Sequence, residues 1–197
     1  MKLYISPIKP HMELNGSEHV AAARRERIRK YRRVEDKARC LVAGLLLKQV
    51  CGVTDDGHLT YGPNGKPYLK NGGMFFNLSH SGDYVTLATA DREVGVDIEK
   101  VAPYSQAVAE RCFTPEELKW MRRRGDDEAF YRLWTAKESV MKAVGLGLSM
   151  PPESFSVLPM DESEHRIGGR SWFLDWTAHD GHVICRAVER GASHFRN

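Results

Sequence analysis

Three turn-forming segments divide residues 55–100 into short stretches, and this limits that part of the chain to short strands. The segments are Asp55-Asp56-Gly57, Gly62-Pro63-Asn64-Gly65 and Asn71-Gly72-Gly73. Glycine, proline, asparagine and aspartate favour turns through their backbone conformations and local hydrogen bonds. Strands are predicted between and after these turns at residues 74–78, 84–89 and 94–98, and Asp91-Arg92-Glu93 is predicted to join the last two as a hairpin.

Helical periodicity precedes and follows this strand region. A helical region is predicted from about residue 18 to residue 50, because residues 35–50 carry apolar side chains at spacings of three and four before Gly52. Thr114-Pro115-Glu116-Glu117 predicts a capped helix start, and a further helix is predicted from Asp127 to Val144. Strands are also predicted at residues 2–8, 155–158, 171–177 and 182–188.

Each half of the chain is therefore predicted to contain helix followed by antiparallel strands, an α+β arrangement. A weak echo links the halves. Val85-x-x-Ala88-x-Ala90-x-Arg92 resembles Val183-x-x-Arg186-x-Val188-x-Arg190, which lies 98 residues later. Four loosely matched positions are also compatible with chance. The absence of a linker rich in proline, serine or glycine predicts that the halves pack tightly.

The composition excludes several classes of protein. The net charge of the 197-residue chain is only +3, so the whole molecule is not a polycation. Its start is too short and too polar for a signal peptide, and the sequence has no apolar run of about 18 residues to span a membrane. The four cysteines form neither a CxxC pair nor a zinc-site spacing. Free thiols in a reducing cytoplasm are the simplest interpretation.

Two carboxylates one residue apart stand in the apolar segment Gly95-Val96-Asp97-Ile98-Glu99-Lys100. If this segment is a strand, Asp97 and Glu99 project to the same side. Their mutual repulsion calls for a nearby positive group, and Lys100 points to the other face. The alternative is an exposed strand end with two solvated acids.

A second segment, residues 134–142, supplies partners for these acids. On a helix, Trp134, Glu138 and Lys142 share one face, which in the simplest case is only a surface Glu–Lys pair. If Glu138 faces Asp97 and Glu99, the three carboxylates suit Mg²⁺, and Lys142 suits phosphate oxygens. The combination indicates metal-assisted chemistry on a phosphate or pyrophosphate.

Positive charge is concentrated in residues 24–39, which hold nine basic and three acidic side chains, while the rest of the chain sums to −3. A solvated helix face, a phosphate-binding face and a nucleic-acid-binding face all remain open for this stretch. Asn77-Leu78-Ser79-His80-Ser81-Gly82 also offers hydroxyls and an imidazole to a phosphate, although His80 could equally be structural. A serine hydrolase is disfavoured because adjacent Ser and His rarely form a nucleophile–base pair and no GxSxG motif is present.

These motifs together resemble the 4′-phosphopantetheinyl transferases. The resemblance rests on residues 95–100, on Phe113-Thr114-Pro115-Glu116-Glu117 and on residues 134–142. Residues 77–81 and Gly65-Lys66-Pro67 resemble the surfactin-synthetase-activating branch, and the motifs keep the family's order from about residue 24 to residue 150. The resemblance implies two similar halves, each an antiparallel sheet packed with helices, fused as an intramolecular pseudo-dimer. We expect halves at residues 1–100 and 101–197 and a monomer.

The resemblance also implies an activity. Members of the family move the 4′-phosphopantetheine arm of coenzyme A to a serine of an acyl or peptidyl carrier protein and release adenosine 3′,5′-bisphosphate. Asp97, Glu99 and Glu138 would hold Mg²⁺ or Mn²⁺, Glu138 would help to deprotonate the serine, and Lys142 would bind the pyrophosphate. The expected coenzyme A ligands are Arg24, Arg27, Arg39, Gly65, Lys66, Pro67, Ser79, His80 and Lys142. Cys40 stands where the family often has a hydroxyl.

Other functions remain as alternatives. Another Mg²⁺-dependent phosphotransfer or pyrophosphate-cleaving enzyme would use the same acids without a carrier. A nucleic-acid-binding module would use residues 24–39, but the sequence has no RNA-recognition aromatic motif and no zinc finger. We therefore expect no nucleic-acid partner. The basic run Arg122-Arg123-Arg124 is the expected docking patch for an acidic carrier protein.

Overall fold

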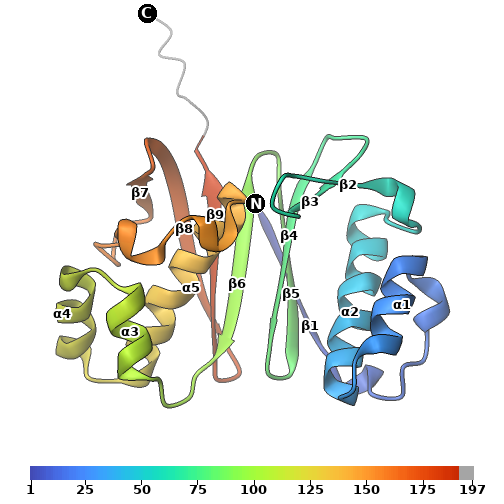
Figure 1. The fold of residues 1–197 in the computed structure, drawn as a ribbon, viewed down its shortest axis with the longest axis horizontal. Coiled ribbons are helices and arrows are strands. Elements are labelled where there is room, and N and C mark those ends of the chain that lie inside the picture. The colour runs from blue at the N-terminus through green and yellow to red at the C-terminus, as the bar shows by residue number, and fades with distance from the viewer. Residues whose placement is uncertain (191–197) are drawn as a thin grey trace, which may run out of the picture.

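Two antiparallel sheets stand side by side at the centre of the molecule, and helices cover their outer faces (Figure 1). The computed structural model describes residues 1–190. The first sheet has the order β1-β5-β4, with β1 (Lys2–Pro7), β4 (Phe75–Ser81) and β5 (Tyr84–Ala90). The second has the order β6-β9-β8-β7, with β6 (Val94–Lys100), β7 (Glu164–Ile167), β8 (Arg170–His179) and β9 (His182–Glu189). A small hairpin joins β2 (Leu59–Tyr61) and β3 (Pro67–Leu69).

The helices of each half pack on its own sheet. The first half contains α1 (Ala22–Lys30) and α2 (Val34–Cys51), and α2 packs on β5. The second half contains α3 (Gln106–Cys112), α4 (Pro115–Arg124) and α5 (Asp127–Val144), and α5 packs on β6 and β9. Short 3₁₀ helices span Lys9–His11, Ser17–His19, Asp56–His58, Gly147–Ser149 and Pro152–Ser154. Among the described residues no helix is long and apolar enough to cross a membrane.

The two halves repeat one topology, which confirms the predicted two-half α+β fold. In each sheet the first strand of the half pairs with the last, and the last strand lies between its neighbours. Strand β5 thus corresponds to β9, so the sequence echo between Val85 and Val183 falls on equivalent strands. The halves meet where β4 packs against β6. Strand β6 lies in the second sheet. The expected domain boundary at residue 100 stays a prediction.

Two sequence predictions were wrong. Asp91-Arg92-Glu93 does not make a β5–β6 hairpin, because β5 already has β1 and β4 on its two edges and β6 pairs with β9. Residues 155–158 form no strand. Their main chain instead binds side chains: Phe155 O accepts a hydrogen bond from Lys137 Nζ, and Val157 N donates to Glu117 Oε1. The helical region predicted from residue 18 to residue 50 contains two helices, α1 and α2, which are separated at residues 31–33.

A buried ion pair holds the 152–157 segment against the helices. Lys137 Nζ lies 2.8 Å from Glu117 Oε2, and both side chains are 0% exposed. Lys137 also donates to the carbonyls of Pro152 and Phe155, at 2.7 and 2.5 Å. Glu117 caps α4 by accepting from Thr114 N at 2.8 Å, as the sequence predicted. Burial lowers the pKa of Lys137, and Glu117 opposes that shift. The pair is satisfied on both sides and joins three segments.

Replacing only one member of this pair should be costly. Lys137→Met leaves a buried carboxylate without its counter-charge, and a loss of about 3–5 kcal/mol in the free energy of unfolding is expected. The double variant Lys137→Met/Glu117→Gln should lose less than the two single losses added together, because no uncompensated charge remains. Urea unfolding followed by circular dichroism measures both, and additive losses would contradict this account.

Strand β6 and helix α5 approach each other closely at Gly95. A Cβ built on Gly95 would lie 1.9 Å from Ser139 O and 2.6 Å from Ala143 N. Both are main-chain atoms of α5, so a side chain there can be accommodated only if the strand moves away from the helix. Glycine therefore sets the spacing between β6 and α5.

Gly95→Ala should destabilise the fold by about 3 kcal/mol or more, at the upper end of overpacking costs. Gly72→Ala is the matched control: its Cβ would meet nothing within 4 Å, and only the strain of its φ of +67° is added. That strain costs about 1 kcal/mol. Thermal melting compares the two variants, and equal shifts would exclude the proposed spacing role.

Candidate functional site

Asp97 and Glu99 project from one face of β6, as predicted, and meet hydroxyls from β4. Ser79 Oγ donates to Asp97 Oδ1 at 2.8 Å, and Ser81 Oγ donates to Glu99 Oε2 at 2.7 Å. Asp97 is buried and Glu99 is half-buried. Since β4 belongs to the first half and β6 to the second, this acid pair lies at the junction between the halves.

Helix α5 completes an acid cluster, which we define as Asp97, Glu99, Glu138 and the ammonium of Lys142. Lys142 Nζ donates to Asp97 Oδ1 at 2.6 Å and to Ser79 Oγ at 3.0 Å. Glu138 lies one turn earlier on the same helix face and is half-buried. The strand and helix segments singled out in the sequence thus meet in space.

The three carboxylates influence one another. Burial raises the pKa of Glu138, and the negative charge of Asp97 adds to the rise while Lys142 opposes it. Burial also raises the pKa of Glu99, with Asp97 contributing in the same direction and Ser81 and Lys142 opposing. One ammonium therefore serves three acids, which leaves the cluster with excess negative charge.

The donor atoms of the acid cluster fit a hard divalent cation. Asp97 Oδ2 is buried and has no hydrogen-bond partner, while Ser79 and Lys142 occupy the Oδ1 side. A buried carboxylate oxygen without a donor is costly unless a cation meets it. Within residues 1–190 no three His, Cys, Asp or Glu side chains are already gathered closely enough to hold a metal. The argument for a cation therefore depends on the unpartnered Oδ2 of Asp97 and on the fact that all candidate ligands are carboxylate oxygens.

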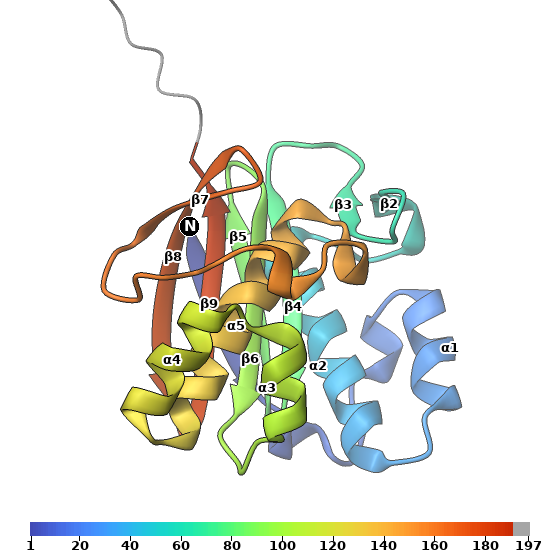
Figure 2. The same ribbon diagram turned by 60° about the vertical axis from the view of Figure 1, so that its left-hand side comes forward.

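A cleft of about 390 Å³ adjoins the acid cluster through Ser79. It lies among α1, α2, β3 and β4, and Figure 2 shows α2 beside β4 with the β2–β3 hairpin above it. We call it the arginine cleft. Its lining residues are Arg24, Arg27, Tyr31, Asp36, Arg39, Cys40, Ala43, Pro67, Asn77, Leu78, Ser79, His80 and Val85.

The arginine cleft is built for an anion. Its lining contains three arginines and a single carboxylate, Asp36, which is paired with Arg39. Desolvation lowers the pKa of His80, and the positive charges of Arg39 and Lys142 lower it further. A bound phosphate would relieve the repulsion among these positive groups.

Most of the predicted coenzyme A ligands line this cleft. Arg24, Arg27, Arg39, Pro67, Ser79 and His80 are among its lining residues. Gly65 lies in the turn before β3, outside the lining, with a φ of +80°. The buried ammonium of Lys66 binds Glu93 Oε2 at 2.5 Å and the carbonyl of Ala143 at 2.6 Å. Lys66 thus ties the first half to the end of α5, and the ligand roles of Gly65 and Lys66 stay predictions.

Sequence reasoning missed two residues that shape the site. Asn77 Oδ1 accepts a hydrogen bond from Val96 N at 3.0 Å and so fastens β4 to β6. Asn77 opens the motif at residues 77–82, so its polar side chain inside a strand was the available signal. Gly95 sets the distance between β6 and α5, and its place beside Asp97 in an apolar strand was the corresponding signal.

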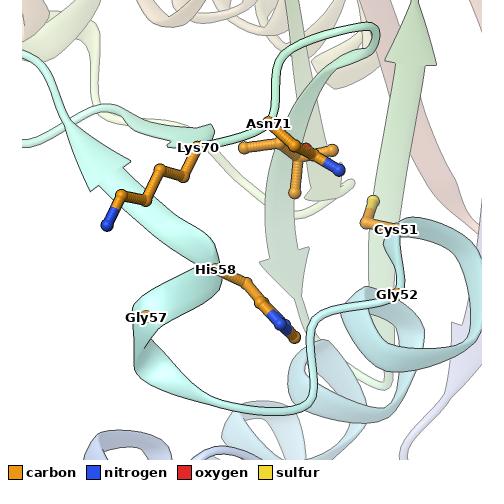
Figure 3. Close-up of a pocket in the computed structure, with 7 residues that line it drawn as sticks. Cys51, Gly52, Gly57, His58, Lys70 and Asn71 are labelled. Atoms are coloured by element: carbon orange, nitrogen blue, oxygen red, sulfur yellow. The ribbon is translucent and has the colours of Figure 1, made fainter.

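A second hollow, of about 370 Å³, lies away from the acid cluster (Figure 3). Cys51, Gly52, Gly57, His58, Leu69, Lys70 and Asn71 line it. No predicted site residue is among them. Burial raises the pKa of Cys51 to about 11, so its thiol is neutral at pH 7 and a poor nucleophile.

The predicted docking arginines form the last turn of α4 and are exposed. The guanidinium carbon of Arg124 lies 5.6 Å from the ring centre of Trp120, a cation–π distance. Arg122 and Arg123 have no ion-pair partner among the described residues. The surface there is positive, and its partner stays a prediction.

Two family models match this chain. Residues 93–190 match the family model described as the 4′-phosphopantetheinyl transferase superfamily, and residues 6–92 match the model for the 4′-phosphopantetheinyl transferase N-terminal part. The chain is 36% identical to a 4′-phosphopantetheinyl transferase of Bacillus subtilis over 157 residues, covering 75% of this chain and 70% of that protein. It is 35% identical to 4′-phosphopantetheinyl transferase Sfp of Bacillus subtilis strain 168, covering 70% of this chain and 66% of that protein.

A solved structure, the holo-[acyl-carrier-protein] synthase of Thermotoga maritima, aligns with a TM-score of 0.36 and 20% identity. The alignment covers 50% of this chain and 62% of that chain. This similarity is too low to support an argument about the site.

Proposed function

The chain belongs to the 4′-phosphopantetheinyl transferase family, and we propose that it transfers the 4′-phosphopantetheine group of coenzyme A to a serine of an apo acyl or peptidyl carrier protein. One observation carries this proposal: an acid cluster and an arginine cleft adjoin at Ser79. The substrate has the matching shape, since coenzyme A carries a pyrophosphate close to a separate nucleotide phosphate.

The arginine cleft would hold the phosphorylated adenosine end of coenzyme A. Arg24, Arg27 and Arg39 supply fixed positive charge, and His80 gains affinity for a proton as a phosphate approaches. Pro67 and the main chain of Gly65 and Lys66 would border the adenine. The Lys66 side chain has a different task, because its ammonium is already bound to Glu93 and Ala143.

The acid cluster would hold the divalent cation. Asp97, Glu99 and Glu138 are its proposed ligands, and Mg²⁺ or Mn²⁺ suits their oxygen atoms. When bound, the cation neutralises charge on the pyrophosphate oxygens. Asp97 is the best placed of the three, since its free Oδ2 is buried and its Oδ1 is fixed by Ser79 and Lys142.

Residues of the chain would accept the proton of the carrier serine and neutralise the charge that develops on the leaving group. The carrier serine oxygen bonds to the phosphorus next to pantetheine, and the bond from that phosphorus to the bridging oxygen breaks. Glu138 accepts the serine proton, a role that its raised pKa favours. Lys142 neutralises the departing adenosine 3′,5′-bisphosphate.

We also propose that the chain acts as a monomer in the cytoplasm. Both halves of the junction come from one chain, and Asp97 and Ser79 meet within it. The four cysteines are free thiols, which supports a reducing compartment.

The decisive test is incubation of the purified chain with coenzyme A, MgCl₂ and a panel of apo-carriers. Mass spectrometry should show one carrier gaining the mass of one phosphopantetheine, and EDTA should abolish the gain. The double variant Asp97→Ala/Glu138→Ala should lose at least about a thousandfold in kcat, because it removes two cation ligands and the base. Cleavage of coenzyme A with no carrier modified would favour the alternative of a pyrophosphate-cleaving enzyme.

Reversing the charges of Arg122, Arg123 and Arg124 to glutamate tests the docking patch. An acidic carrier should then bind more weakly, so KM for the carrier should rise about tenfold or more at low salt while KM for coenzyme A stays within twofold. Adding salt should shrink the difference between the variant and the original chain. Equal rises in both KM values would argue against docking at this surface.

A further inference from the structure

The tight turn between β4 and β5 reaches across to the second half of the molecule. Its Gly82 has a φ of +51°, and a Cβ built there would lie 2.6 Å from Nε2 of His182. His182 opens β9 and is 2% exposed. The second half therefore packs against this turn so closely that only glycine fits.

The carbonyl of Gly82 binds Arg39, which lines the arginine cleft. It accepts two hydrogen bonds from Arg39, from Nε at 2.9 Å and from Nη2 at 2.7 Å. The third nitrogen, Nη1, donates to Asp36 Oδ1 at 2.7 Å. Since the guanidinium is planar and rigid, the position of this carbonyl sets the direction in which Arg39 faces the arginine cleft.

His182 is itself held in place. Its Nδ1 is 2.8 Å from the carbonyl of Asp180, and its ring meets the ring of Tyr84 edge-on with centres 5.1 Å apart. The Tyr84 hydroxyl donates to Asp180 Oδ2 at 2.8 Å. The remaining nitrogen, Nε2, is buried without a hydrogen-bond partner and faces Gly82. The imidazole therefore has little freedom to move aside if a side chain is added at position 82.

We propose that Gly82 is a positioning residue for coenzyme A. Its missing side chain lets the β4–β5 turn pack against His182. This packing fixes the Gly82 carbonyl, which orients the Arg39 guanidinium toward a phosphate of the ligand. All residues lining the arginine cleft belong to the first half. The contact between Gly82 and His182 therefore lets the second half influence the geometry of that cleft. The inference rests on the proposed function, because it names coenzyme A as the ligand of that cleft.

Titration calorimetry with coenzyme A and Mg²⁺ tests the proposal on the full chain. Gly82→Ala should weaken binding about tenfold, the cost of one displaced charge-assisted hydrogen bond. In turnover assays KM for coenzyme A should rise while kcat stays within about twofold, because Gly82 touches no reacting atom. Gly72→Ala is the control for backbone strain, since its φ is also positive and its Cβ would meet no atom within 4 Å. Its affinity should match that of the original chain.

A double variant separates the contact from the strain. A His182→Ala background removes the closest contact of the added methyl group. The next atom, Cδ of Lys100 at 3.2 Å, belongs to a flexible exposed side chain that can move aside. His182→Ala and Gly82→Ala/His182→Ala should therefore bind coenzyme A equally well. Unchanged binding by Gly82→Ala, or a double variant as weak as Gly82→Ala, would overturn the proposal. If Gly82→Ala alone does not fold, the double variant must regain its melting transition. Failure to regain it would count equally against the contact.

Arg39→Lys provides a test that needs no change at position 82. It keeps the charge but loses the planar group that Gly82 aims, so binding should weaken about tenfold. Binding within twofold would show that charge alone matters and would overturn the proposal. If the original chain itself binds no coenzyme A, the proposed function fails. If the original chain binds coenzyme A but Gly82→Ala and Gly72→Ala bind it with the same affinity, only the positioning role fails.

Discussion

The contact between β6 and α5 at Gly95 is the constraint on which the site depends. The strand carries Asp97 and Glu99, and the helix carries Glu138 and Lys142, so their spacing decides whether the four groups form a cluster. With no side chain at position 95, the strand lies against the main chain of Ser139 and Ala143. Two residues further along the strand, Asp97 then lies 2.6 Å from the Lys142 ammonium. Packing at a glycine thus fixes the electrostatics of the site.

The repeated topology allows the two halves to be compared position by position. Helices α2 and α5 are both 18 residues long and end at Gly52 and Gly145, 93 residues apart. The same offset of 93 residues relates β1 to β6. Tyr4 is therefore the structural equivalent of Asp97, and Leu45 is the equivalent of Glu138. Where the second half has Asp97 and Glu138, the first half therefore has an aromatic and an apolar side chain, while Glu99 corresponds to Ser6. Its polar residues instead line the arginine cleft.

Local signals in the sequence were enough to predict α5 and to group the acidic and basic side chains that share a face of each element. Asp126 caps the start of α5 and Gly145 ends it, so both boundaries are encoded by neighbouring residues. The same-face rules for strands and helices grouped Asp97 with Glu99 and Glu138 with Lys142. Strand partners were not local, and this is why the β5–β6 hairpin was predicted wrongly. The burial of the Lys66 ammonium against Glu93 was likewise invisible, since a lysine in a turn gives no sign that a distant helix end will meet it.

Ser79 lies at the boundary between two regions of opposite charge. Its hydroxyl donates to Asp97 and accepts from Lys142, while the same residue lines the arginine cleft. On one side are three carboxylates with a single ammonium, and on the other are three arginines with a single carboxylate. Each region alone is destabilised by like charge. An anion in the cleft relieves only one of them and a divalent cation only the other. A polyphosphate ligand that arrives with its cation would relieve both.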